Sequence, residues 1–327
     1  MNKKMELLET IRDIAKPFAL AKYVDDWQHR AMKLSTISDF YKIRIRENAF
    51  ISEGKIQFDL DFLSLSPLKQ ALKEKFFCSY KTKKIGYAFE YDCLSGQQYD
   101  ISYKMYGDLD ASEKIVMSTC AHAICNLSCP LEVVLDLCNL LYEEALHLEA
   151  ISTLLSIDQS KKPWIPNDKQ GNWRLVSSTD TIFSYLFIEH CLYEGRGLIA
   201  AAKGVYELQK YGIDPTVYQV VKSIFEQETN HALIGYFWLK QLDNGNKDEE
   251  LKTAIKKFFD TEPMEGIESF RGKRQRFPLF LVSNYLKNRD YWQIRKIVME
   301  NAKHCVLTGE LALDDEQLAR ATTELIW

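Results

Sequence analysis

Four long segments between residues 109 and 242 show helical periodicity, and each carries a glutamate inside a stripe of apolar residues. The stripe around Glu144, for example, contains Leu137, Leu141 and Leu148, because residues three or four positions apart share one face of a helix. A charged glutamate on such a face costs several kcal/mol of folding free energy if it has no partner. A bound cation shared between helices is the most economical compensation.

Turns and breaks delimit the four segments and order them as two pairs. Ser128–Pro130 separates the first segment from the second, and Tyr211–Pro215 separates the third from the fourth. A longer polar stretch, Lys161–Ser178, joins the two pairs. The segments run from about Leu109 to Ser128, from Pro130 to about Ile157, from Thr181 to about Lys210 and from Thr216 to about Leu242. Two helical hairpins with one longer connection are typical of a four-helix bundle.

Two of the glutamates stand three residues before a histidine, in the pairs Glu144–His147 and Glu228–His231. On a helix, each pair can present a carboxylate and an imidazole to the same metal ion. The spacing alone is a weak signal, because 6 histidines and 46 acidic residues in 327 positions produce roughly one such pair by chance. Asp26-x-x-His29 is an example, since its helical neighbours are charged and its face is therefore solvated.

The other two glutamates, Glu113 and Glu194, strengthen the signal through their register. In an antiparallel hairpin, two residues are level when they are equally far from the turn. Glu113 and Glu144 are equidistant from the first break, and Glu194 and Glu228 are equidistant from the beginning of the second turn. Each hairpin is therefore predicted to bring a single glutamate level with a glutamate–histidine pair.

This pattern resembles the ferritin-like di-iron carboxylate superfamily, in which two helices each supply a glutamate and two others each supply a Glu-x-x-His pair. Its members include the ribonucleotide reductase small subunit, soluble desaturases, bacterial monooxygenase hydroxylases and arylamine N-oxygenases. The resemblance covers residues 109–242, and it implies an all-α, ferritin-like four-helix bundle that binds two iron ions, with manganese as an alternative. The implied metal ligands are Glu113, Glu144, His147, Glu194, Glu228 and His231. Glu144 and Glu228 are the implied bridges between the two ions.

Departures from individual families narrow the expected activity. Ribonucleotide reductase small subunits carry a radical tyrosine one turn after the first histidine, where this chain has Ile151, so radical storage is not expected. Arylamine N-oxygenases carry an extra histidine where this chain has Ile224. His190, one turn before Glu194, is a candidate seventh ligand, a partner of a ligand, or a histidine bonded to a backbone group.

The resemblance implies an O₂-activating oxygenase or oxidase that acts on a small organic substrate. Electrons would come from a partner reductase or from the substrate, because the sequence has no flavin or nicotinamide fingerprint. Two alternatives remain: a ferritin-like iron-handling protein, and a metal-free all-α interaction protein in which Arg196 neutralises the buried glutamates. The substrate, the type of oxidation and the formation of a homodimer are left open.

The remaining chain is expected to elaborate this core. Residues 1–108 are predicted to form helices, with a small hairpin between Lys84 and Met105, where aromatic residues alternate. Residues 109–243 form the predicted di-metal core. Residues 244–327 are predicted to add about three helices that pack on it.

Composition excludes several classes of protein. The formal charge is −4 and the isoelectric point is near 6.0, which argues against nucleic-acid binding. No apolar run suggests a signal segment or a membrane span, so we expect a cytoplasmic protein. The eight cysteines form no CxxC pair, and the spacing of Cys120, His122, Cys125 and Cys129 fits no common zinc site.

Several residues beside the expected ligands have simpler interpretations. Four acids fall off the apolar stripes and are expected to be solvated: Glu143, Glu149, Glu189 and Glu226. Gly195 and Gly197 follow Glu194 closely in the sequence. Glycine within a helix often marks a π-bulge or a close approach of two backbones. A pocket wall is a further possibility there.

Overall fold

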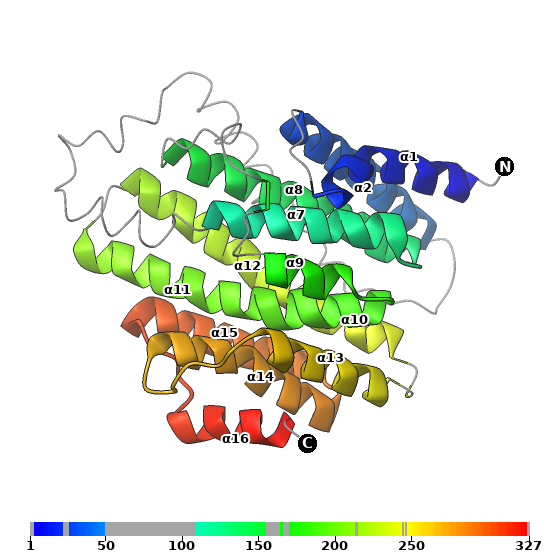
Figure 1. Cartoon of the computed structure of the whole chain (residues 1–327). Helices are drawn as coiled ribbons and strands as arrows, with labels where there is room; N and C mark the ends of the chain where they lie inside the picture. The colour runs from blue at the N-terminus through cyan, green and yellow to red at the C-terminus, as the bar shows by residue number, and fades with distance from the viewer. Residues whose placement is uncertain are drawn as a thin grey trace.

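The computed structural model describes residues 3–21, 26–49, 109–154, 164–165, 170–212, 215–243, 245 and 247–325. Every regular element in these ranges is a helix, which confirms the all-α prediction for the described part of the chain (Figure 1). The hairpin expected between Lys84 and Met105 lies outside the described residues. No helix within the described ranges has the length and apolar composition needed to cross a membrane.

The first predicted hairpin consists of α7 (Leu109–Asn126) and α8 (Leu131–Leu154), which pack along each other. The break between them falls at Ser128–Pro130, as the sequence predicts, because proline favours the start of a helix over its interior. Most side chains of α8 are buried, since this helix contacts α7, α2 and α12. It is therefore a central helix of the molecule.

The second hairpin has a more complex first arm. The single helix expected over Thr181–Lys210 is instead α10 (Ile182–Leu186), a π-helix η5 (Phe187–Tyr193) and α11 (Glu194–Tyr211) in direct succession. Gly212 closes α11 at φ 64°, a left-handed conformation that glycine adopts without steric cost. The second arm is α12 (Pro215–Leu242), which packs against both α11 and η5.

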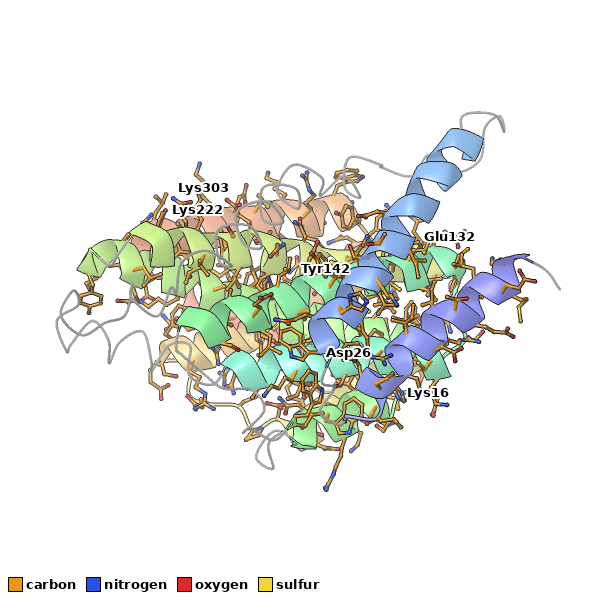
Figure 2. All side chains as sticks on the ribbon, turned by 90° about the horizontal axis from the view of Figure 1, so that it is seen from above. Lys16, Asp26, Glu132, Tyr142, Lys222 and Lys303 are labelled. Carbon is orange, nitrogen blue, oxygen red and sulfur yellow. The ribbon has the colours of Figure 1, made fainter. Side chains whose placement is uncertain are left out.

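Two N-terminal helices cover the first hairpin. These are α1 (Lys3–Ala19), which packs on α7, and α2 (Trp27–Ala49), which packs on α8 (Figure 2). Buried hydroxyl groups join α2 to α8, as when the Ser38 hydroxyl donates to the carbonyl oxygen of Leu135 at 2.7 Å. Pro17 lies within the last turn of α1, and the helix continues to Ala19.

The second hairpin is covered by the C-terminal helices, of which the described residues form four where about three were predicted. They are α13 (Asp248–Thr261), α14 (Phe270–Asn288), α15 (Tyr291–Thr308) and α16 (Asp315–Leu325). Helices α14 and α15 pack on α11, and α16 packs on α14, forming the layers below α11 in Figure 1. A further short helix, α9 (Gln170–Ser177), occupies part of the stretch expected to be a loop, and packs on α7 and α13.

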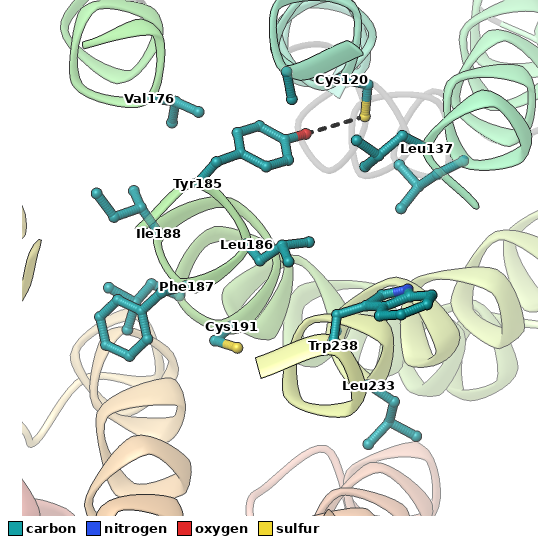
Figure 3. Packing of buried hydrophobic residues seen from close by; sticks show 14 of the residues in the cluster. Cys120, Leu137, Val176, Tyr185, Leu186, Phe187, Ile188, Cys191, Leu233 and Trp238 are labelled. Atoms are coloured by element: carbon teal, nitrogen blue, oxygen red, sulfur yellow. Dashed lines mark hydrogen bonds between the residues drawn. The ribbon is translucent and has the colours of Figure 1, made fainter. Parts of the chain in front are cut away.

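The core lies between the two hairpins. Figure 3 shows Tyr185 and Leu186 of α10 packed among residues of α7, α8 and α12, with the Tyr185 hydroxyl donating to the sulfur of Cys120 at 3.3 Å. In the same region, the indole N–H of Trp238 donates to a carboxylate oxygen of Asp136 at 2.8 Å, which joins α12 to α8. Both contacts join the first hairpin to the second.

Candidate metal centre

The four glutamates and two histidines predicted from the sequence converge in the interior. Two groups of ligand atoms each lie within 4.8 Å of one another, and all six residues are buried. The first group is Glu113, Glu144, His147 and Glu228; the second is Glu144, Glu194, Glu228 and His231. Glu144 and Glu228 belong to both groups, which is the position of carboxylates that bridge two ions.

The register of the helices explains this convergence. Glu113 and Glu144 meet because α7 and α8 pack side by side in antiparallel orientation, and Glu194 and Glu228 meet because α11 and α12 do the same. Contacts of α8 with α12 then bring the two hairpins together at this level. Helical spacing places each histidine on the same face as the glutamate three residues before it.

Both histidines point their Nδ1 atom into the cluster. His147 Nδ1 lies 3.3 Å from a Glu144 oxygen, 3.4 Å from a Glu228 oxygen and 3.8 Å from a Glu113 oxygen. The Nδ1 atom of His231 lies 2.7 Å from a Glu144 oxygen and 3.9 Å from a Glu228 oxygen. Each imidazole therefore offers the same ring nitrogen to the centre.

The other ring nitrogen of each histidine is held by a residue of the opposite helix. His147 Nε2 lies 2.7 Å from the side-chain oxygen of Gln227, and His231 Nε2 lies 3.0 Å from a carboxylate oxygen of Glu143. Both partners can accept a hydrogen bond from Nε2–H, so Nδ1 is the nitrogen that faces the carboxylates, and it can bind a cation once the imidazole has lost its second proton. Metal-binding histidines are usually oriented in this way.

The pKa values of the buried glutamates show that they cannot all be ionised together unless positive charge lies close to them. Burial, followed by the charge of Glu144, raises the pKa of Glu113 well above its usual value. Burial and the charge of Glu228 do the same to the pKa of Glu194. Burial opposes ionisation of Glu144, yet His231 and His147 hold its pKa well below the usual value.

The pKa values of the two histidines are raised by the neighbouring carboxylates. Burial lowers the pKa of His231, but the charge of Glu144 outweighs burial and raises this pKa to about 10. The pKa of His147 is likewise raised, against burial, chiefly by the charge of Glu144. Protons therefore balance the carboxylates in this structure, and divalent ions can replace them, because metal binding to such ligands releases protons.

Hydrogen bonding gives a second indication that these residues fit a metal. Among the described residues, several buried atoms at the centre make no hydrogen bond of normal geometry and have mainly one another as close polar neighbours, although buried polar atoms normally have a well-aligned partner. They are both oxygens of Glu144, one oxygen of Glu194, and Nδ1 of His147 and His231. The donor set of carboxylate oxygens and imidazole nitrogens could hold a metal ion, and these atoms are among its candidate ligand atoms.

Glycines allow the close packing around the second half of the site. A Cβ atom on Gly197 would lie 3.3 Å from a Glu228 oxygen and 3.6 Å from a Glu194 oxygen. A Cβ atom on Gly195 would lie 2.9 Å from Cβ of Pro278, which is closer than real Cβ contacts. Gly195 thus permits the close approach of α11 to α14 at Pro278, and the π-helix η5 ends at Tyr193, directly before Glu194.

His190 is close to the centre but outside both ligand groups. It is fully buried in η5, and its ring packs edge-on against Tyr185 with 5.5 Å between ring centroids. Neither ring nitrogen has a hydrogen-bond partner among the described residues, so of the three possibilities named for His190, a bond to a backbone group is not found. Burial lowers the pKa of His190 to about 3, and the charge of His231 adds to this effect.

Two of the acids expected to be solvated are buried, so this part of the prediction is wrong. Glu143 is 2% exposed and contacts His231, as described above. Glu189 is 1% exposed and accepts a hydrogen bond from the Thr119 hydroxyl at 3.0 Å. Burial raises the pKa of Glu189 to about 8. Glu149 and Glu226 are partly exposed, in agreement with the expectation.

Physical reasons account for both errors. Glu143 lies beside the apolar stripe of α8, but α12 covers that face, so the side chain meets His231 and not water. Glu189 lies in η5, where the wider π turn changes the angular position of each residue relative to an α-helix. One sequence signal was available: Glu143 and Gln227 each directly precede the glutamate of a Glu-x-x-His pair.

The other residues considered in the sequence analysis lie outside the two ligand groups. His29 is exposed, and its neighbour Asp26 pairs with Arg30 at 2.6 Å, as expected for a solvated face. Within the described ranges, the cysteines near His122 take part in no metal-binding cluster. Arg196, the candidate counter-ion for the buried glutamates, pairs with Glu262 at 3.0 Å.

Comparison with known proteins does not assign the chain to a family. No family model, no curated protein and no solved structure matches it. The function must therefore be argued from the chemistry of the site itself.

Proposed function

We propose that this chain is a ferritin-like di-iron oxygenase or oxidase, which uses O₂ to oxidise a small organic substrate. The observation that carries the proposal is the pair of four-residue ligand groups that share Glu144 and Glu228. A mixed set of carboxylates and imidazoles suits Fe(II), with Mn(II) as an alternative. A bound iron pair supplies electrons and open coordination positions for the reduction of O₂.

In this proposal, the protein side chains hold and orient the ions. Glu113 and His147 belong to one position, Glu194 and His231 to the other, and the two shared glutamates bridge them. Glu143 and Gln227 fix the orientation of the imidazoles through their Nε2 atoms. The surrounding apolar residues exclude water, which strengthens the electrostatic interactions of the ligands.

The same site argues against a metal-free structural role. The metal-free alternative relied on Arg196 to neutralise the four buried glutamates, and the guanidinium of Arg196 is engaged by Glu262 instead. Storage of a tyrosyl radical is also not proposed, because a buried isoleucine, Ile151, lies one turn after His147. The reducing electrons are proposed to come from a partner reductase or from the substrate.

The test is metal analysis followed by exposure to oxygen. Protein loaded with Fe(II) without oxygen should retain close to two ions per chain after removal of free metal. Addition of O₂ should then produce near-ultraviolet or visible absorption of ferric iron, without a tyrosyl radical signal in electron paramagnetic resonance. A folded protein that retains no iron after this loading would disprove the proposal.

A further inference from the structure

The two histidines of the candidate centre have similar geometry but chemically different partners. The Nε2–H of His231 donates to the carboxylate of Glu143, and the Nε2–H of His147 donates to the carboxamide of Gln227. Both acceptors are buried, and each occupies the position directly before a bridging glutamate. The contacts are therefore equivalent in position and differ in the charge of the accepting group.

This difference affects how strongly each imidazole binds a cation. A carboxylate that accepts the Nε2–H bond draws the proton toward itself and increases the electron density at Nδ1, whereas a neutral amide does so less. The carboxylate also places a negative charge close to one ion position. Gln227 has the further property that its amide cannot take up the Nε2 proton.

The other ligands do not create a comparable difference. Each position has one unshared glutamate, Glu113 or Glu194, and these are 4% and 5% exposed. Glu144 and Glu228 are common to both positions. Among the groups that contact a ligand atom or its imidazole ring, the Glu143–Gln227 pair is thus the clearest chemical difference between the two halves.

We propose that the two metal positions are unequal, and that the His231 position binds a divalent ion first and more tightly than the His147 position. Glu143 and Gln227 act as positioning residues that set this order. The proposal rests on the proposed di-metal function and adds to it an order of binding. It also identifies the His147 position as the one at which an ion exchanges more readily.

The experiment is a titration of the metal-free protein with Co(II), followed by absorption spectroscopy and calorimetry in the absence of oxygen. Wild-type protein should bind two ions in two steps with separated affinities. Loss of such a partner typically changes metal affinity by about 10–100-fold, so the expected separation is about tenfold or more. Crystals grown with one Co(II) per chain should show anomalous scattering at His231.

Two nearly isosteric variants test the cause. Glu143→Gln should weaken the first step by about tenfold or more and bring the two steps together, because both histidines then face an amide. Gln227→Glu should tighten the second step and bring the steps together at high affinity. The double variant that exchanges the two residues should move the first ion to His147. Circular dichroism and thermal unfolding verify that each variant is folded.

The possible failures are distinguishable. Two equal binding steps in the wild type, a first ion at His147, or an unchanged titration of folded Glu143→Gln would each overturn the inference while leaving a two-metal protein. Wild-type protein that binds no Co(II) and no Fe(II) would instead overturn the proposed function.

Discussion

The two hairpins that form the candidate centre contribute equivalent sets of candidate ligands, but their backbones differ. In the first hairpin, α7 and α8 are uninterrupted α-helices, and each ligand lies where ordinary helical periodicity predicts. In the second, the arm that carries Glu194 contains a seven-residue π-helix directly before this residue. Regular α-helices are therefore sufficient to place such residues at the centre. The π-helix η5 is not needed for that purpose, so its consequence must lie elsewhere.

That effect is to place more polar groups in the interior. Glu189 and His190 both lie in η5 and are buried, and neither belongs to a ligand group. A π-helix is rare and is frequently found at functional sites. Close packing against α12 accommodates it here, since a Cβ atom on Gly235 would come within 2.7 Å of Cβ of His190.

The largest effect is expected on metal content, when a glutamate common to both ligand groups is removed instead of one that belongs to a single group. Glu228→Ala removes a donor from both positions, so we expect the metal content to fall from two ions to below one and O₂ reactivity to disappear. Glu113→Ala removes a donor from one position, and about one ion should remain. Elemental analysis after anaerobic Fe(II) loading measures both, with exposed His29→Ala as the control that retains two ions.

Stability should be followed in the same variants. Removing a buried carboxylate from an apolar face relieves a desolvation cost, so metal-free Glu228→Ala should unfold at the same denaturant concentration as the wild type or a higher one. A severe loss of stability without metal would indicate that Glu228 supports the fold through a protein partner, and would count against its assignment as a ligand.

The π-helical arm should give the metal-free protein a pH-dependent stability through Glu189. Its pKa in the folded protein is raised from 4.5 to about 8, so the folded state binds more protons than the unfolded state between these values. The resulting stabilisation is complete below pH 4.5 and is lost as the pH rises through about 8. At about 1.4 kcal/mol per pKa unit, the loss is on the order of a few kcal/mol.

Glu189→Gln isolates this contribution, because glutamine keeps an oxygen that can accept from Thr119 but does not ionise. Urea unfolding of the metal-free variant should show a smaller decline in stability between pH 5 and pH 8 than the wild type. Identical declines in both proteins would mean that Glu189 ionises as freely in the folded state as in the unfolded chain.

A smaller effect is expected from filling the space at Gly235. Gly235→Ala places a methyl group 2.7 Å from His190 and 2.8 Å from Cys191, which forces the π-helix to move. Overpacking of this kind costs roughly 1–3 kcal/mol. Gly171→Ala in α9 is the matched control, since its new Cβ would meet its nearest neighbour at 4.0 Å. The control should be neutral or slightly stabilising, because alanine favours a helix more than glycine does.

The smallest effect is expected at His190. His190→Leu removes two buried ring nitrogens that have no hydrogen-bond partner among the described residues, so stability at neutral pH should rise by about 1 kcal/mol. The protein should still bind two ions, because His190 lies outside both ligand groups. Loss of one ion in a folded variant would instead establish His190 as a seventh ligand.

The sequence by itself determined the helical segments and the residues that converge at the centre. Helical periodicity placed each glutamate on an apolar face, and the equal distances from the two turns placed Glu113 beside Glu144 and Glu194 beside Glu228. These are local properties, since they depend on the 3.6-residue period and on short connections. The same reasoning identified the solvated face of His29 correctly.

The tertiary structure alone decided what lies next to the ligands. Whether an acid beside an apolar stripe meets water or protein depends on which helix covers that face, and this buried Glu143 against His231. The π-helix that buried Glu189 depends on space that Gly235 leaves in a helix distant along the chain. The different partners of the two histidines also depend on the tertiary structure. Gln227 and His147 lie on different helices, and the periodicity of one helix does not show which side of another helix it faces.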